Sequence, residues 1–181
     1  MTSPQIAAIG FRIHTGWAAV IVISGRPERF DLRIRRRIEL LPQDGSIVRF
    51  MFHQAAEMPS EKAKGLIEEA KQAARDYALK SLTHIHKEVK LAAAGIPAGA
   101  TVLPDDLATI LASHARIHAA EGQLFQNAIR EACEHFRMNV VPTRERNLVV
   151  DETLRSRFGP PWGADQKLAT ASALEALKSV A

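Results

Sequence analysis

The chain of 181 residues has the length of one domain, and its 46% hydrophobic content is typical of a folded protein rather than a disordered one. The single cysteine, Cys133, excludes an internal disulfide and a metal site built from several cysteines. The apolar runs are too short to span a bilayer and the first residues lack a signal-peptide pattern, so we expect a cytoplasmic protein without a membrane partner. The formal net charge of +4 is compatible with nucleic-acid binding but does not by itself indicate it.

The first 55 residues predict three antiparallel strands. Residues 6–24 are apolar with a continuous β-branched centre, as in a strand buried on both faces, and a bend is expected around residues 10–16. Residues 30–40 alternate between apolar and charged side chains, with Arg36 as the exception, which predicts a half-exposed strand. Residues 47–53 resemble a third strand, and turn residues between the three stretches favour a meander.

Helices and strands alternate in the rest of the chain. Good helix formers and helical periodicity predict three helices, over residues 60–86, 104–136 and 164–180. Short apolar stretches predict two further strands, near residues 88–95 and 139–143. A meander followed by this alternation indicates one α/β domain over residues 1–181, with a five-stranded mixed sheet flanked by helices.

Two local motifs add to this order of elements. The stretch IGFRIHTGWAAV contains Thr15, Gly16 and Trp17 after a glycine-containing strand, and VVPTRERNL is followed by WGADQKLATASALEAL near the end of the chain. Together with the order of elements, these motifs resemble the ribonuclease H-like superfamily, and within it the Holliday-junction resolvase group. The resemblance implies a ribonuclease H-like fold and an association with nucleic acid.

The resemblance also implies a set of carboxylates that this sequence does not contain. The group places an aspartate on the first strand, a glutamate on the fourth, and one or two acids at the last helix, where they hold two divalent ions. Here the first strand has Arg12 between Phe11 and Ile13, the fourth strand reads KLAAAGI, and only Asp165 stands where a family acid belongs. One aspartate is too few for two hard ions, so we expect no ordinary two-metal nuclease activity. Asp165 is a candidate catalytic residue, with helix capping as the alternative.

The stretch HARIHAAEG places polar residues on an apolar helix face. His114, His118 and Glu121 follow one another at i, i+4 and i+7, inside the stripe that contains Leu107 and Phe125. Because an unpaired buried charge is costly, we expect all three side chains to be shielded from water and surrounded by polar partners.

This cluster has several interpretations. His114, His118 and Glu121 are candidate catalytic residues, either as ligands of zinc or a similar ion or as a Glu–His general base, and His14 could approach the same region. The alternative is a structural role, with the helix broken near Ala115 or Gly122 and the polar side chains turned to solvent or to another subunit. The identity of any cofactor or metal stays open.

A second candidate surface is basic. Arg33, Arg35 and Arg37 share one face of the second predicted strand and are candidates for binding nucleic-acid phosphates, although Asp31 and Glu39 beside them favour a solvated face.

The sequence therefore predicts a divergent nucleic-acid-associated protein without two-metal nuclease activity. A non-catalytic protein-assembly module, with self-association into a homo-oligomer, and a metal-dependent hydrolase using the His/Glu cluster are the alternatives. A divergent member of the sugar-kinase and actin-like superfamily is disfavoured by the short chain and the missing phosphate-binding loops.

Overall fold

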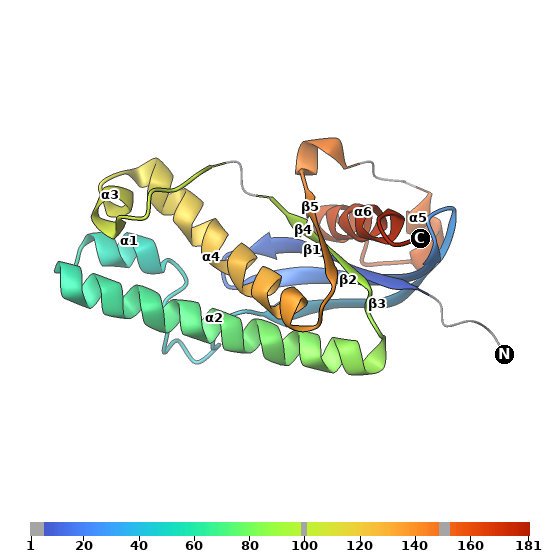
Figure 1. The fold of residues 1–181 in the computed structure, drawn as a ribbon, viewed down its shortest axis with the longest axis horizontal. Helices are drawn as coiled ribbons and strands as arrows, with labels where there is room; N and C mark the ends of the chain where they lie inside the picture. The colour runs from blue at the N-terminus through green and yellow to red at the C-terminus, as the bar shows by residue number, and fades with distance from the viewer. Residues whose placement is uncertain (1–5, 99–100, 149–152) are drawn as a thin grey trace.

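The computed structural model describes residues 6–98, 101–148 and 153–181. The prediction that the first residues form no signal peptide concerns residues 1–10, of which residues 1–5 lie outside the described residues. Five strands form one mixed sheet in the order β3-β2-β1-β4-β5 (Figure 1). Strands β1, β2 and β3 are antiparallel, whereas β4 and β5 run parallel to β1, so the predicted fold class is confirmed. The strands span Ala7–His14 (β1), Trp17–Arg26 (β2), Arg29–Glu39 (β3), Ala93–Pro97 (β4) and Asn139–Thr143 (β5).

The first predicted strand is in fact a hairpin of two strands. His14 at the end of β1 pairs with Trp17 at the start of β2, and Thr15 and Gly16 form the turn between them. Gly16 has φ +83°, a left-handed conformation that glycine adopts without strain. The predicted bend around residues 10–16 therefore marks a complete reversal of the chain, which supplies the second strand of the meander.

The predicted third strand over residues 47–53 is wrong. This stretch leads into a short helix, α1 (Met51–Ala56), whose buried residues Met51, Phe52 and Ala55 have helical spacing. Helix α1 packs against α2 (Ser60–Glu88) and α4 (His114–His135), so its apolar side chains contact helices rather than the sheet. Three antiparallel strands precede residue 55 as predicted, but two of them, β1 and β2, come from the stretch predicted as one strand.

A β-bulge changes the faces of β3. The pairing with β2 shifts between Val22 and Ile23, where Arg33 is the unpaired residue. As a result Ile34 packs in the cluster beneath α2 and α4, whereas Phe30 packs in the cluster beneath the last helix. The prediction that all apolar residues of 30–40 share one face is therefore wrong.

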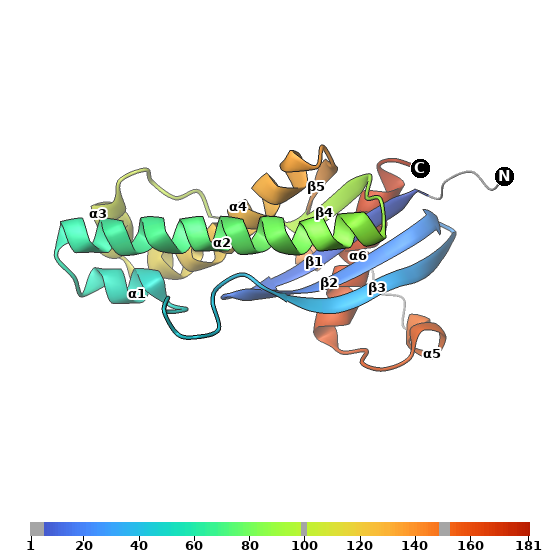
Figure 2. The ribbon, with the colours of Figure 1, turned by 90° about the horizontal axis from the view of Figure 1, so that it is seen from below.

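Helices cover both faces of the sheet (Figures 1 and 2). Helices α2 and α4 lie on one face, and α6 (Ala164–Lys178) lies on the other. Helix α6 lies so close to the strands that a Cβ atom added at Gly10 or Gly95 would be 2.1 Å from a backbone oxygen of α6. This contact places the first turn of α6 beside the carboxyl end of β1. Within the described residues, no helix combines the length and apolar character needed to cross a membrane.

The second predicted helix is divided in two, and two short elements complete the fold. Asp106 caps α3 (Leu107–Leu111) by accepting a hydrogen bond from the Thr109 N–H, and the chain is extended at Ser113 before α4 begins. Helix α5 (Leu154–Phe158) and the 3₁₀ helix η1 (Glu145–Asn147) lie between β5 and α6.

Candidate functional site

The carboxyl end of β1 meets the first turn of α6 in a cluster of paired charges. The Nε2 atom of His14 lies 2.8 Å from Oδ1 of Asp165, and Nε of Arg12 lies 4.0 Å from the same oxygen. Arg12 also pairs with Glu145, at 3.2 Å between Nη1 and Oε2. The side chains of Arg12 and Asp165 are each about one-third exposed, so the cluster is open to solvent.

This edge of the sheet is where the resemblance implies two divalent ions, and the residues present do not fit them. Asp165 occupies a position compatible with a family acid, but its carboxylate is engaged by His14 and Arg12. Strand β4 contributes Ala93–Pro97, none of which is acidic. Two hard cations need several oxygen ligands and would be repelled by the Arg12 guanidinium at the centre of the cluster.

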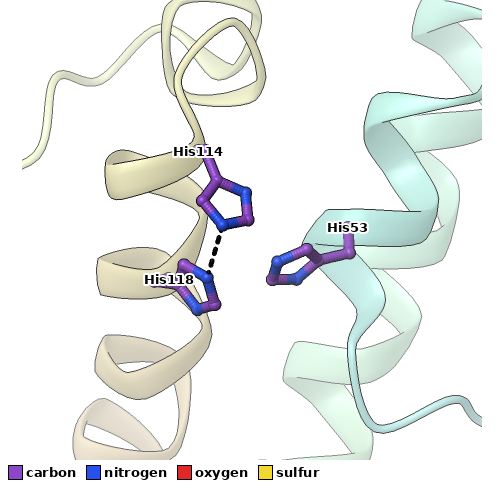
Figure 3. A group of neighbouring side chains, drawn as sticks. All are labelled: His53, His114 and His118. Atoms are coloured by element: carbon purple, nitrogen blue, oxygen red, sulfur yellow. Dashed lines mark hydrogen bonds between the residues drawn. The ribbon is translucent and has the colours of Figure 1, made fainter.

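A second polar cluster lies between α1 and α4 (Figure 3). Three histidines, His53 of α1 and His114 and His118 of α4, place one ring nitrogen each within 4.8 Å of the others. The Nε2 atoms of His114 and His118 are 2.9 Å apart, so one of them donates a hydrogen bond to the other. The ring of His53 meets both of the other rings edge-on, at centroid distances of 5.5 and 4.7 Å.

Glu121 lies beneath these histidines and is only 3% exposed. Its Oε1 accepts hydrogen bonds from the backbone N–H groups of Phe52 and His53, at 2.8 and 3.4 Å, and lies 3.3 Å from Nδ1 of His53. These are N–H groups in the first turn of α1, which has no side-chain cap of its own, so Glu121 caps α1 from another helix. Burial raises the pKa of Glu121, and the hydrogen bonds from His53 and Phe52 oppose that shift.

The structure brings the predicted His114, His118 and Glu121 together but corrects their burial. Glu121 is buried with polar partners as expected, whereas His114 and His118 are exposed, so the prediction that all three are shielded from water is wrong for the histidines. The helical periodicity correctly placed the three side chains on one face of the helix. However, the first turns of α4 extend past the strands and lie beside α1 (Figure 1). An apolar stripe predicts the face of the helix on which a side chain lies, but it does not predict which element packs against that face.

His14 lies at the border between the two clusters. It lines a depression of about 210 Å³ together with His118 and Glu121, as the sequence suggested it could. Sequence reasoning missed His53, because residues 47–53 were interpreted as a strand. The helical spacing of Met51, Phe52 and Ala55 was the signal that would have placed His53 on a helix.

The three arginines of β3 have different environments. Arg35 donates four hydrogen bonds of 2.8–3.3 Å to the carbonyl oxygens of residues 158–161, which ties β3 to the loop before α6. Arg37 pairs with Glu39 at 2.6 Å, and its guanidinium lies 4.2 Å from the ring centre of Trp17. Arg33 is exposed and makes no ion pair or hydrogen bond with the residues that the structure describes. The three arginines therefore do not form a uniform phosphate-binding surface, because the guanidinium of Arg35 is hydrogen-bonded within the protein.

Arg36, the exception in the alternating pattern, points to the opposite face. It forms a bidentate pair with Glu88 at the end of α2, with distances of 2.8 and 3.0 Å. This pair lowers the pKa of Glu88 through the hydrogen bond from the guanidinium.

Strand order, sheet topology and the placement of helices define a ribonuclease H-like fold. The chain is similar in structure to Thermus thermophilus RuvC in complex with a Holliday-junction substrate, with a TM-score of 0.51 and 13% identity over 93% of this chain and 90% of that one. It is also similar to a second Thermus thermophilus RuvC structure, with a TM-score of 0.49 and 11% identity over 93% and 92% of the two chains. No protein-family model and no curated protein matches the sequence.

Proposed function

We propose that the protein binds nucleic acid through the charged edge of its sheet and lacks two-metal nuclease activity. The observation that carries this proposal is that β1 presents Arg12 and His14, which pair with Glu145 and Asp165, on the strand where the resemblance implies an acid. A cluster of carboxylates needs metal ions before it can approach phosphates, whereas an arginine attracts phosphates directly.

The surface beside this cluster supports the proposal. The ring of His14 stacks on Trp17 with centroids 4.1 Å apart, and Arg37 lies over the same indole. Arginine guanidinium groups beside an aromatic ring suit both phosphates and unstacked bases. The similar RuvC structure holds a Holliday junction, which makes branched DNA the first ligand to test.

The binding experiment uses labelled four-way junction, duplex and single strand at low and moderate salt. We expect affinity that falls steeply with salt and depends little on sequence. Arg37→Ser should weaken binding and reduce the salt slope by about 1, because one phosphate contact is lost. Arg75→Ser is a matched control, because Arg75 pairs with Glu131 on the surface and its side chain is 47% exposed, against 48% for Arg37. Equal affinities of wild type, Arg37→Ser and Arg12→Ser would contradict the proposed interface.

The catalytic half of the proposal has its own test. Purified protein should not cleave four-way junctions or RNA–DNA hybrids in the presence of magnesium or manganese. Cleavage that copurifies with the protein in independent preparations, disappears with a chelator and is abolished by Asp165→Asn would show that this edge binds metal after all.

A non-catalytic assembly module is the alternative function. Phe50 and Val102 are 57% and 95% exposed, and they are the apolar residues that this alternative would place at a contact with another protein. Sedimentation measured over a range of concentrations distinguishes the two functions, because an assembly module should self-associate without nucleic acid.

A further inference from the structure

The histidine cluster between α1 and α4 is built from two elements that are distant in sequence. His53 comes from α1, and His114 and His118 come from the first two turns of α4 (Figure 3). His53 points across the gap between the helices toward His114 and His118, and one ring nitrogen of each residue lies within 4.8 Å of the others. The i, i+4 spacing on α4 explains why His114 and His118 are neighbours, but it does not explain why His53 of α1 lies beside them.

The spacing of the nitrogens is close to that of a tetrahedral metal site. A zinc ion with Zn–N bonds of about 2.0–2.1 Å separates its ligand atoms by roughly 3.3 Å. The Nε2 atoms of His114 and His118, at 2.9 Å, would move apart by a few tenths of an ångström, and His53 would move inward from a distance of at most 4.8 Å. Because His114 and His118 are exposed, rotation of their side chains can widen the distance between their own nitrogens and bring both closer to the half-buried His53.

Glu121 is a second, independent observation that points to a ligand. Its Oε1 lies 3.3 Å from Nδ1 of His53, which directs the proton to Nδ1 and leaves Nε2 of His53 with a free lone pair. Metal-binding histidines commonly donate their other ring N–H to a carboxylate in this way. The Oε2 atom of Glu121 is buried and has no hydrogen-bond partner among the described residues, so this carboxyl group is not fully satisfied by the protein itself.

We propose that His53, His114 and His118 bind one divalent transition-metal ion of the zinc type, with Glu121 as a positioning residue for His53. Three imidazoles suit zinc, copper or nickel rather than magnesium or calcium. They leave a fourth tetrahedral position for water or an external ligand. The bound ion would also link α1 to α4. The proposal is independent of nucleic-acid binding, since it uses none of Arg12, Arg37 or Asp165.

The first experiment measures metal binding by untagged protein that has been freed of metal with a chelator. Titration with Co²⁺ should produce the visible absorption of a tetrahedral site, and calorimetric titration with Zn²⁺ should give one ion per chain. His118→Ala and His114→Ala should each lower the Zn²⁺ affinity at least tenfold. His84→Ala is the matched control, because His84 is exposed on α2 and its Nδ1 contacts only the backbone oxygen of Lys80 among the described residues.

The second experiment separates positioning from structure. Glu121→Gln keeps an oxygen that accepts the Phe52 N–H but removes the charge, so the metal-free variant should melt near the wild-type temperature. Its Zn²⁺ affinity should nevertheless fall by about 10–100-fold. Zn²⁺ should raise the melting temperature of the wild type and leave that of His118→Ala unchanged. Affinities for Zn²⁺ that are equal in wild type, His114→Ala and His118→Ala would overturn the metal site. An unchanged affinity in Glu121→Gln would overturn the role of Glu121.

Discussion

Replacing Arg35 by alanine should destabilise the protein rather than weaken its binding to phosphates. The guanidinium donates four hydrogen bonds of 2.8–3.3 Å to the carbonyl oxygens of residues 158–161. A hydrogen bond with a charged donor contributes about 1.5–3 kcal/mol, but water replaces part of this at the exposed carbonyls. We therefore expect a loss of about 2 kcal/mol for the whole set. For a chain of this size that corresponds to a fall in Tm of about 4–8 °C.

Calorimetry and urea unfolding of three variants measure this loss. Arg33→Ala is the matched control and should change the free energy of unfolding by less than about 0.5 kcal/mol, because Arg33 has no hydrogen-bond partner among the described residues. Arg35→Lys should recover little stability, since one ammonium group cannot reach four carbonyls in the geometry of a guanidinium. If Arg35→Ala melts with the wild type but binds nucleic acid more weakly, the assignment of Arg35 to the loop is refuted.

Three further predictions concern the core. Burial raises the pKa of the Cys133 thiol to about 12, so iodoacetamide at pH 8 should modify the unfolded chain and not the folded one. The free energy of unfolding should decline as pH rises from about 9 toward 12, because only the thiol of the unfolded chain readily ionises in this range. Gly95→Ala should prevent α6 from packing on β4, because the added Cβ would lie 2.1 Å from the Ser172 carbonyl oxygen, and circular dichroism melting should show a large loss of stability. Glu121→Ala should lower the free energy of unfolding by about 1–3 kcal/mol, measured in urea, because it leaves the buried Phe52 N–H without an acceptor.

The sequence predicted the order of the later elements because each has a local signal, although the predicted helix over residues 104–136 is two helices and the strand predicted near residues 88–95 is Ala93–Pro97. The helix after Pro59 and the strand over residues 139–143 lie where helix formers and apolar residues placed them. The errors fall where two local signals compete. Residues 6–24 contain two strands of the same composition, and only Gly16 marks the turn between them. Residues 47–53 contain β-branched and aromatic residues that are common in strands, but α2 and α4 provide an apolar surface that favours a helix.

The candidate site depends on contacts that no local pattern contains. Periodicity placed Glu121 on a buried face, yet its partners are 68 and 69 residues away in α1. Arg35 has the same strand periodicity as Arg33 and Arg37, and only the position of the 158–161 loop distinguishes it. The resemblance implied an acid on the first strand, which has Arg12 and no carboxylate, but the pairing of Arg12 with Glu145 required the three-dimensional structure.

In the proposed function, Arg12 and His14 on β1 also determine what the sheet edge requires from metal ions. In a two-metal nuclease the ions stabilise the attacking and leaving oxygens and reduce the repulsion between carboxylates and substrate phosphates, so a chelator removes cleavage. Here Arg12 already neutralises part of the charge of Glu145 and Asp165, and Arg37 adds a second cation beside Trp17. We therefore expect the affinity for a four-way junction to be the same in magnesium and in EDTA when the ionic strength is matched. Anisotropy titrations in the two buffers, with His118→Ala in parallel to remove any contribution from the histidine cluster, make the comparison. Suppose that the affinity of the wild type falls in EDTA, and that His118→Ala in magnesium keeps the wild-type affinity. The histidine cluster would then not be responsible, and Asp165 and Glu145 would have to bind a cation and separate from Arg12 and His14 when the nucleic acid binds.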